Sequence, residues 1–184
     1  MTTHAALIWS MLTLMAVGAQ SAAIARREPR QPSRHPANAK TTDADFVKEA
    51  AQRGLAEVAL GNLALERAQN PDVRQFARRI VDERSGANQQ LMDLAKSQGV
   101  DVPKEMGPEQ RNTKARLSTL SGATFDREYM RAAVTDHARD IAELRDYSQN
   151  GKNEALKAWA ARTLPTLRKH QQLAGAAAAK VGAS

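Results

Sequence analysis

Four ionisable side chains interrupt apolar stripes in this sequence, and their types are those that build metal sites or buried ion pairs. Glu57, Arg84, His137 and His170 each stand among small or apolar residues that recur every three or four positions. A carboxylate and two imidazoles are ligands that helical bundles offer to divalent metals. An arginine opposite a carboxylate instead indicates a buried ion pair, because buried charges are normally paired.

The stripes also predict where these side chains lie along their helices. At about 1.5 Å of rise per residue, Glu57 lies roughly 21 Å from the start of its helix. Arg84 lies roughly 21 Å from the end of the next helix, which is the same end of a helical hairpin. His137 and His170 fall within about a turn and a half of that depth. We therefore expect one polar layer in the middle of the fold. The four stripes are Phe46, Ala50, Gly54, Glu57, Gly61 and Ala64; Val73, Ala77, Ile80, Arg84, Ala87 and Leu91; Met130, Val134, His137, Ile141 and Leu144; and Leu156, Ala160, Thr163, Leu167, His170 and Ala174.

One interpretation of this layer is a site for a single divalent metal such as Fe, Mn or Zn. Glu57, His137 and His170 would be its ligands. Gly54 and Gly61 flank Glu57 by one helical turn on each side and would leave room for the ion.

The other interpretation is an ion pair between Glu57 and Arg84, with the histidines completing its hydrogen bonds and no cofactor. Arg84 favours this interpretation, because a permanent cation repels a metal ion. The Glu-x-x-His motifs of di-iron bundles are also missing from the second and fourth long helices. A pocket for a small anion beside Arg84 is a third alternative.

The elements that must hold these residues are all helical, because the 3.6-residue period dominates from Asp43 onward and strand alternation is absent. Short connections join the first two and the last two long helices, and a long connector with a short helix joins the pairs. The fold class predicted is therefore all-α, a ferritin-like four-helix bundle with a long crossover between helices 2 and 3. The expected helices span 43–68, 71–99, 108–120, 125–150 and 154–179, with Thr42, Asn70, Gly107, Thr124 and Asn153 at or just before their starts.

The N-terminal part has a different composition from the helical part. Residues 1–25 carry no Asp, Glu, Lys or Arg, and an apolar run from Ala5 to Ala19 precedes small residues that resemble signal-peptidase sites. We expect a cleaved signal peptide over 1–25, a basic Pro-rich linker over 26–42 and the helical domain over 43–180. The linker holds Arg26, Arg27, Arg30 and Arg34, which could meet an anionic surface; a solvated spacer is the simpler interpretation.

Composition excludes several classes of protein. The net charge is +7, and more than half of it lies in residues 26–42. The helical domain is therefore only mildly basic, and only 4% of residues are aromatic, which argues against nucleic-acid binding. Cysteine is absent, so disulfides and thiolate sites are excluded. No serine lies in the polar layer to act with His137 as a nucleophile, and we expect Glu83 and Asp140 to face solvent.

Several motifs resemble a known family in the order in which they occur: Ala-Glu-Val-Ala-Leu-Gly at 56–61, Asn-Pro-Asp-Val-Arg-Gln-Phe-Ala-Arg-Arg-Ile-Val-Asp at 70–82, Phe-Asp-Arg-Glu-Tyr-Met at 125–130, Asp-His at 136–137 and Leu-Pro-Thr-Leu-Arg-Lys-His at 164–170. They resemble the bacterial exported family called domain of unknown function 4142. The resemblance implies a ferritin-like bundle in the cell envelope and supplies no established activity. Its members usually carry a histidine at the position of Arg84, whereas Glu57, Asp136-His137 and His170 match the family.

The sequence thus predicts an exported protein, periplasmic or associated with the outer membrane. We expect a non-enzymatic structural or interaction role, with an envelope component or an anionic surface as partner and self-association as a further option. The alternative function is metal binding or metal-dependent redox chemistry through Glu57, His137 and His170.

Overall fold

The structure is a computed structural model that describes residues 42–183, and these form five helices and no strand, which confirms the all-α prediction. The helices are α1 (Asp43–Arg67), α2 (Pro71–Ser97), α3 (Pro108–Ser118), α4 (Gly122–Asn150) and α5 (Glu154–Val181). The predicted signal peptide and nearly all of the predicted linker, with Arg26, Arg27, Arg30 and Arg34, lie outside the described residues.

Side chains begin three of the long helices where the sequence predicted them to. The Thr42 hydroxyl accepts the Asp45 amide at 3.1 Å, and the Asn70 side chain accepts the Asp72 amide at 2.9 Å. The Asn153 side chain accepts the amide of Ala155 at 3.0 Å. These bonds satisfy donors that have no partner inside a helix. The predicted start of α4 at Thr124 is wrong, because the extended residue before this helix is Ser121.

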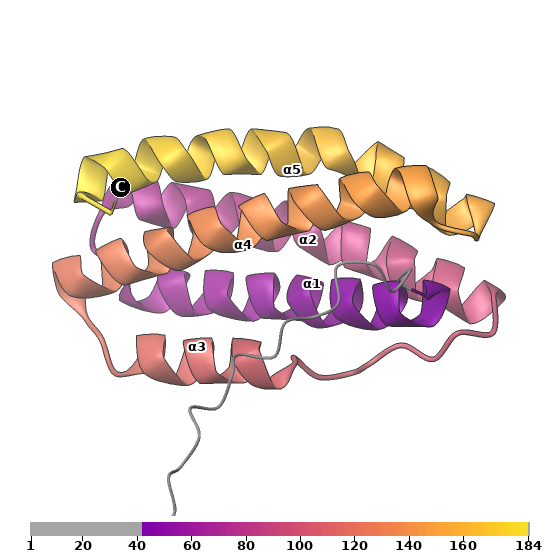
Figure 1. The fold of residues 1–184 in the computed structure, drawn as a ribbon. Coiled ribbons are helices and arrows are strands. Elements are labelled where there is room, and N and C mark those ends of the chain that lie inside the picture. Colours follow the sequence, from indigo (N-terminus) through magenta and orange to yellow (C-terminus); the bar gives the residue numbers. More distant parts are fainter. Residues whose placement is uncertain (1–41, 184) are drawn as a thin grey trace, which may run out of the picture. The chain divides into compact units, whose positions relative to one another are not determined.

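The four long helices pack around a common axis, with each contacting two others. In order around the axis they are α1, α2, α5 and α4 (Figure 1). Short turns at 68–70 and 151–153 make α1–α2 and α4–α5 antiparallel hairpins. The connector that contains α3 runs back along α1, so α4 begins at the end of the molecule where α2 also begins (Figure 1). Side chains from all four helices therefore meet along one axis.

The apolar core is divided into two clusters along that axis. One contains Leu60, Phe76, Ile80, Phe125 and Met130 together with the C-terminal part of α5. The other contains Phe46, Leu91, Leu144, Trp159 and Leu167. On each long helix, one stretch of residues separates the two clusters, and that stretch carries Glu57, Arg84, His137 or His170. A buried polar layer therefore crosses the whole fold between the two apolar halves.

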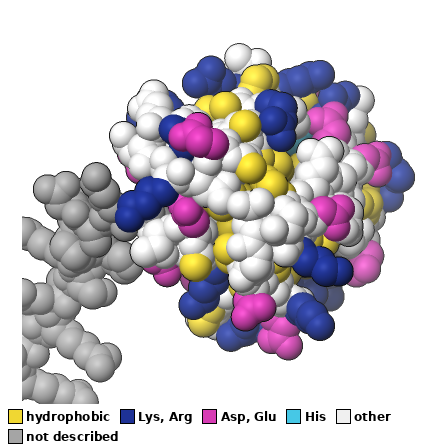
Figure 2. All heavy atoms as spheres, turned by 90° about the vertical axis from the view of Figure 1, so that its right-hand side faces the viewer, with side chains coloured by type: hydrophobic (Ala, Val, Ile, Leu, Met, Phe, Trp, Pro, Cys, Tyr) yellow, Lys and Arg dark blue, Asp and Glu magenta, His cyan; other side chains and the backbone are white. Residues whose placement is uncertain are grey.

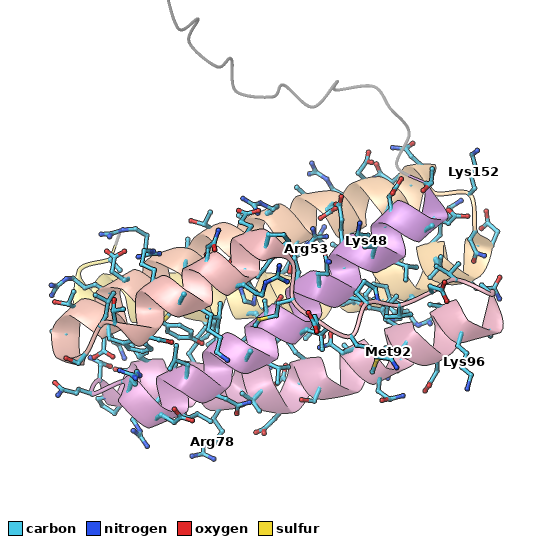
Figure 3. All side chains as sticks on the ribbon, turned by 90° about the horizontal axis from the view of Figure 1, so that it is seen from below. Lys48, Arg53, Arg78, Met92, Lys96 and Lys152 are labelled. Atoms are coloured by element: carbon cyan, nitrogen blue, oxygen red, sulfur yellow. The ribbon has the colours of Figure 1, made fainter. Side chains whose placement is uncertain are left out.

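At the end of the described part where α1 begins, positive and negative side chains are mixed on the surface (Figure 2). Figure 2 views the end where α1 begins and shows Lys and Arg side chains interspersed with Asp and Glu. Lys48, Lys96 and Lys152 lie near this end (Figure 3). No helix among residues 42–183 combines the length and the apolar character that a membrane span requires.

Candidate functional site: a buried layer of charged and imidazole side chains

The central contact of the layer joins α1 to α2. The Arg84 Nε lies 2.8 Å from Glu57 Oε2 in an ion pair, and both residues are buried, at 4% and 8% exposure. The depth calculated from the sequence therefore places these two side chains correctly relative to each other. Because neither charge reaches water freely, each depends on the other for compensation.

His137 of α4 lies beside this pair. Its Nδ1 donates to the Ala133 carbonyl at 2.9 Å, since a carbonyl can only accept. In the neutral ring, Nε2 therefore carries the lone pair, and it lies 3.7 Å from Glu57 Oε2. Burial lowers the pKa of His137 to about 4, although the bond to Ala133 opposes the shift. His137 is therefore a neutral acceptor at neutral pH.

His170 of α5 is fully buried and contacts His137 edge to face, with ring centroids 5.5 Å apart. Its Nε2 lies 2.8 Å from Glu83 Oε2 and donates to that carboxylate. Burial lowers the pKa of His170, and the bond to His170 lowers the pKa of Glu83. The structure thus brings all four predicted residues into one layer, but it pairs His170 with Glu83 rather than with Glu57. Glu83, at 36% exposure, also accepts from Arg79, so the expectation that Glu83 faces solvent holds only in part.

Sequence reasoning missed a second guanidinium and its carboxylates. Arg53 extends from α1 toward α4 (Figure 3), where its Nε lies 2.6 Å from Asp140 Oδ1 and its Nη2 contacts Glu143. Asp140 is only 2% exposed and also lies 3.9 Å from Arg84 Nη2. The prediction that Asp140 faces solvent is therefore wrong. The available signal was its spacing, since a residue three positions after His137 lies on the same helix face.

The two glycines beside Glu57 do not leave free space. A Cβ atom on Gly61 would lie 2.8 Å from Val81 Cγ2 and 3.3 Å from the Ala77 carbonyl oxygen. A Cβ atom on Gly54 would lie 2.0 Å from the side-chain oxygen of Asn88. The room that the sequence analysis assigned to a metal ion is filled by α2. The glycines instead allow α1 and α2 to approach closely.

The layer holds more carboxylates than guanidiniums, and Arg53 and Glu143 are its partly buried members. Glu57, Asp140 and Glu143 face Arg53 and Arg84. Burial raises the pKa of Glu57, and the charge of Arg84 only partly offsets this. Burial likewise raises the pKa of Glu143 to about 7, with Glu49 adding to the shift. The layer therefore takes up protons more readily than exposed carboxylates do.

A small cavity of about 20 Å³ adjoins Glu57 and His137. Asp136 also lines it, and burial together with the charge of Asp140 raises the pKa of Asp136 to about 6. The remaining wall is mainly apolar, including Leu60 and Phe76. This volume is enough for one water molecule that bonds to the polar groups.

The imidazoles have the orientation that metal ligands need, but the described residues do not complete a ligand set. His137 Nε2 and His170 Nδ1 are both buried without a hydrogen-bond partner, while the other nitrogen of each ring is bonded. Metal-bound histidines are usually held in this way. Within residues 42–183, however, no three Asp, Glu or His side chains are grouped closely enough to hold a metal ion.

Comparison with known proteins identifies a matching family and solved structures of similar fold. The profile of a family described as "Domain of unknown function (DUF4142)" matches residues 28–177. A DUF305 fragment from Deinococcus radiodurans has a TM-score of 0.65 and 19% identity, and the match covers 74% of this chain and 95% of that chain. CopM in the Cu(II)-bound form also has a TM-score of 0.65, at 15% identity over 77% of this chain and 99% of that chain.

A DUF305 protein from Streptomyces coelicolor has the same TM-score of 0.65, at 15% identity over 79% of this chain and 96% of that chain. A comparison with curated protein sequences gave no match. At these identities the solved structures show a shared fold.

Proposed function

The chain belongs to the family described as Domain of unknown function (DUF4142), and from this premise we propose that it is an exported, non-enzymatic helical scaffold of the cell envelope. The observation that carries the proposal is the Arg84–Glu57 pair, which joins α1 to α2 in the middle of the core. A guanidinium there supplies the positive charge that a metal would otherwise bring. Such a pair fixes the register of the helices more than it adds stability.

The order of the elements supports a ferritin-like topology for this scaffold. A hairpin, a crossover that carries α3 and a second hairpin are the arrangement of ferritin-like folds. In the proposed organisation, residues 1–25 are a cleaved signal peptide, 26–42 a basic linker and 43–180 the scaffold.

Export is tested by fractionating bacteria that express the full chain and sequencing the N-terminus of the purified protein. We expect a mature chain in the periplasmic or outer-membrane fraction that begins between residues 20 and 26. Deleting residues 5–19 should leave the chain in the cytoplasm. An uncleaved wild-type chain in the cytoplasm would contradict the proposal.

The proposed scaffold meets its partner through the linker. Arg26, Arg27, Arg30 and Arg34 would attract an anionic envelope polymer or phospholipid surface, and this attraction should weaken steeply with salt. Sedimentation of the mature protein with phosphatidylglycerol vesicles at low and high salt tests this, and a variant with all four arginines replaced by glutamine is the control. Self-association is tested in the same samples by analytical ultracentrifugation.

The second candidate function is metal binding by Glu57, His137 and His170, and one observation favours it. The free lone pairs of His137 and His170 are buried and unpartnered, and the similar structure CopM is described with bound Cu(II). Arg84 opposes this candidate, since its Nε lies 2.8 Å from the carboxylate that would bind the ion.

Calorimetric titration of the full chain with Cu(II), Zn(II), Mn(II) and Fe(II) separates the two candidates. Stoichiometric binding that is lost in both His137→Ala and His170→Ala would establish the metal site. The scaffold proposal predicts no such binding. Replacement of the exposed Lys169 by alanine is the matched control.

A further inference from the structure

A groove of about 420 Å³ lies between α2 and α5, with a lining separate from that of the cavity beside Glu57 and His137. Small-molecule sites commonly have volumes of about 300–1,000 Å³. Its polar lining comes from Arg84 and Gln90 on α2 and from Trp159, Arg162, Thr163 and Thr166 on α5. The groove shares Arg84 and Glu83 with the polar layer, but the proposed scaffold role does not use the space between α2 and α5.

The wall of the groove contains a buried donor that lacks an acceptor. Trp159 is 3% exposed and packs edge to face on Phe46 within the core. Its Nε1 nevertheless has no hydrogen-bond partner among the described residues. An indole N–H can only donate, and a buried donor without an acceptor destabilises a protein. An acceptor that enters the groove would remove this penalty.

The charges around the groove favour an anion as the source of that acceptor. Arg84 forms its inner wall, but its charge is compensated by Glu57, whereas Arg162 lines the exposed side without an ion pair to any described carboxylate. The lining carboxylate is Glu83, whose two oxygens are already bonded to Arg79 and His170. The groove therefore offers guanidinium, indole and amide donors and the Thr166 hydroxyl, while its carboxylate is occupied; the Thr163 hydroxyl already donates to the Trp159 carbonyl at 2.9 Å.

We propose that the α2–α5 groove binds a small organic carboxylate, which Arg162 attracts and to which the Trp159 N–H donates. Guanidinium groups match the planar geometry of a carboxylate. Gln90 and Thr166 would bond to neighbouring hydroxyl groups, as in an acidic sugar or a hydroxy acid, and the Thr163 oxygen could accept from one. This inference depends neither on export nor on the absence of a metal.

Trp159 makes the proposal directly measurable. The chain has two tryptophans, and the other is Trp9, so a full chain with Trp9→Phe reports on the groove through one fluorophore. The probes are glucuronate, citrate and inorganic phosphate, with neutral glucose as the uncharged match of glucuronate. We expect a saturable change in fluorescence with glucuronate or citrate and none with glucose.

Variants distinguish the groove from other surfaces. Arg162→Gln should weaken carboxylate binding about tenfold, because a charged hydrogen bond is lost. Arg145→Gln, an exposed arginine on α4, should leave binding unchanged. The proposal is overturned if no carboxylate binds up to about 10 mM, if Arg162→Gln binds as the wild type does, or if phosphate is the probe that binds while the carboxylates do not.

Discussion

The energetic coupling between Glu57 and Arg84 is the sharpest prediction from this structure. In Arg84→Met, the 2.8 Å ion pair with Glu57 and the 3.9 Å approach to Asp140 are both lost, leaving buried carboxylates behind. Breaking a buried pair by removing one partner destabilises by about 3–5 kcal/mol. Because Arg53 still compensates Asp140, we expect the lower end of that range, about 3 kcal/mol.

The double variant separates pairing from packing. Glu57→Gln alone should cost about 2 kcal/mol, since Arg84 retains Asp140 as a distant partner. The double variant Glu57→Gln/Arg84→Met should cost only about 2 kcal/mol, because neither charge is then left alone. The coupling free energy is therefore expected to be about 3 kcal/mol.

The assay is urea unfolding of the four proteins followed by circular dichroism at neutral pH, with linear extrapolation to water. The matched control is the surface pair Arg116–Glu128, also 2.8 Å long but with Arg116 half exposed. Arg116→Met and Glu128→Gln should couple by less than about 1 kcal/mol. A coupling for Glu57 and Arg84 within about 0.5 kcal/mol of zero would refute the reasoning.

Three further predictions follow from the same structure. Gly61→Ala should destabilise the protein by about 1 kcal/mol in thermal unfolding, because the new Cβ presses on Val81 and the overpacking outweighs the gain in helix propensity. Gly86→Ala, which has open space around it, should stabilise the protein by about 1 kcal/mol in the same assay. Asp126→Ala should cost about 2 kcal/mol by urea unfolding, because the buried carboxylate accepts two amides of the α1–α2 turn, at 2.9 and 3.2 Å; an unchanged midpoint would show that the turn needs no such anchor. The pKa of Glu143 is raised to about 7 in the folded chain, so the folded state binds the Glu143 proton more tightly than the unfolded state does. The stability that this proton contributes is present below about pH 4.5 and is lost as the pH rises to about 7. Glu143→Gln should flatten that part of a stability-against-pH profile, and an unchanged slope would contradict the assignment.

The sequence could predict where helices begin and how far along its helix each polar residue lies. Asn70 and Asn153 begin helices because their side chains accept amides only two or three residues away, which any reader of the sequence can locate. The shared depth of Glu57 and Arg84 follows from rise per residue once the hairpin is inferred. The structure shows these residues in contact at 2.8 Å.

The partners that were missed depend on side-chain reach between helices. Arg53 lies one turn before Glu57 but forms an ion pair across to Asp140 on α4. His170 bonds to Glu83, which belongs to none of the four apolar stripes. Treating each helix as contributing one polar residue hid these contacts. The close approach at Gly61 was missed for the same reason, because it depends on how far apart α1 and α2 lie.

The most direct test of the central claim is elemental analysis of the full chain purified without a histidine tag, compared with Arg84→His prepared in the same way. The proposed scaffold, held by the Arg84–Glu57 pair, predicts no stoichiometric Cu, Zn, Mn or Fe on the wild type. Metal that appears only on Arg84→His would show that the guanidinium occupies the place of a metal ligand. One metal ion per wild-type chain, lost in His137→Ala and in His170→Ala, would contradict the account and make the layer a metal centre.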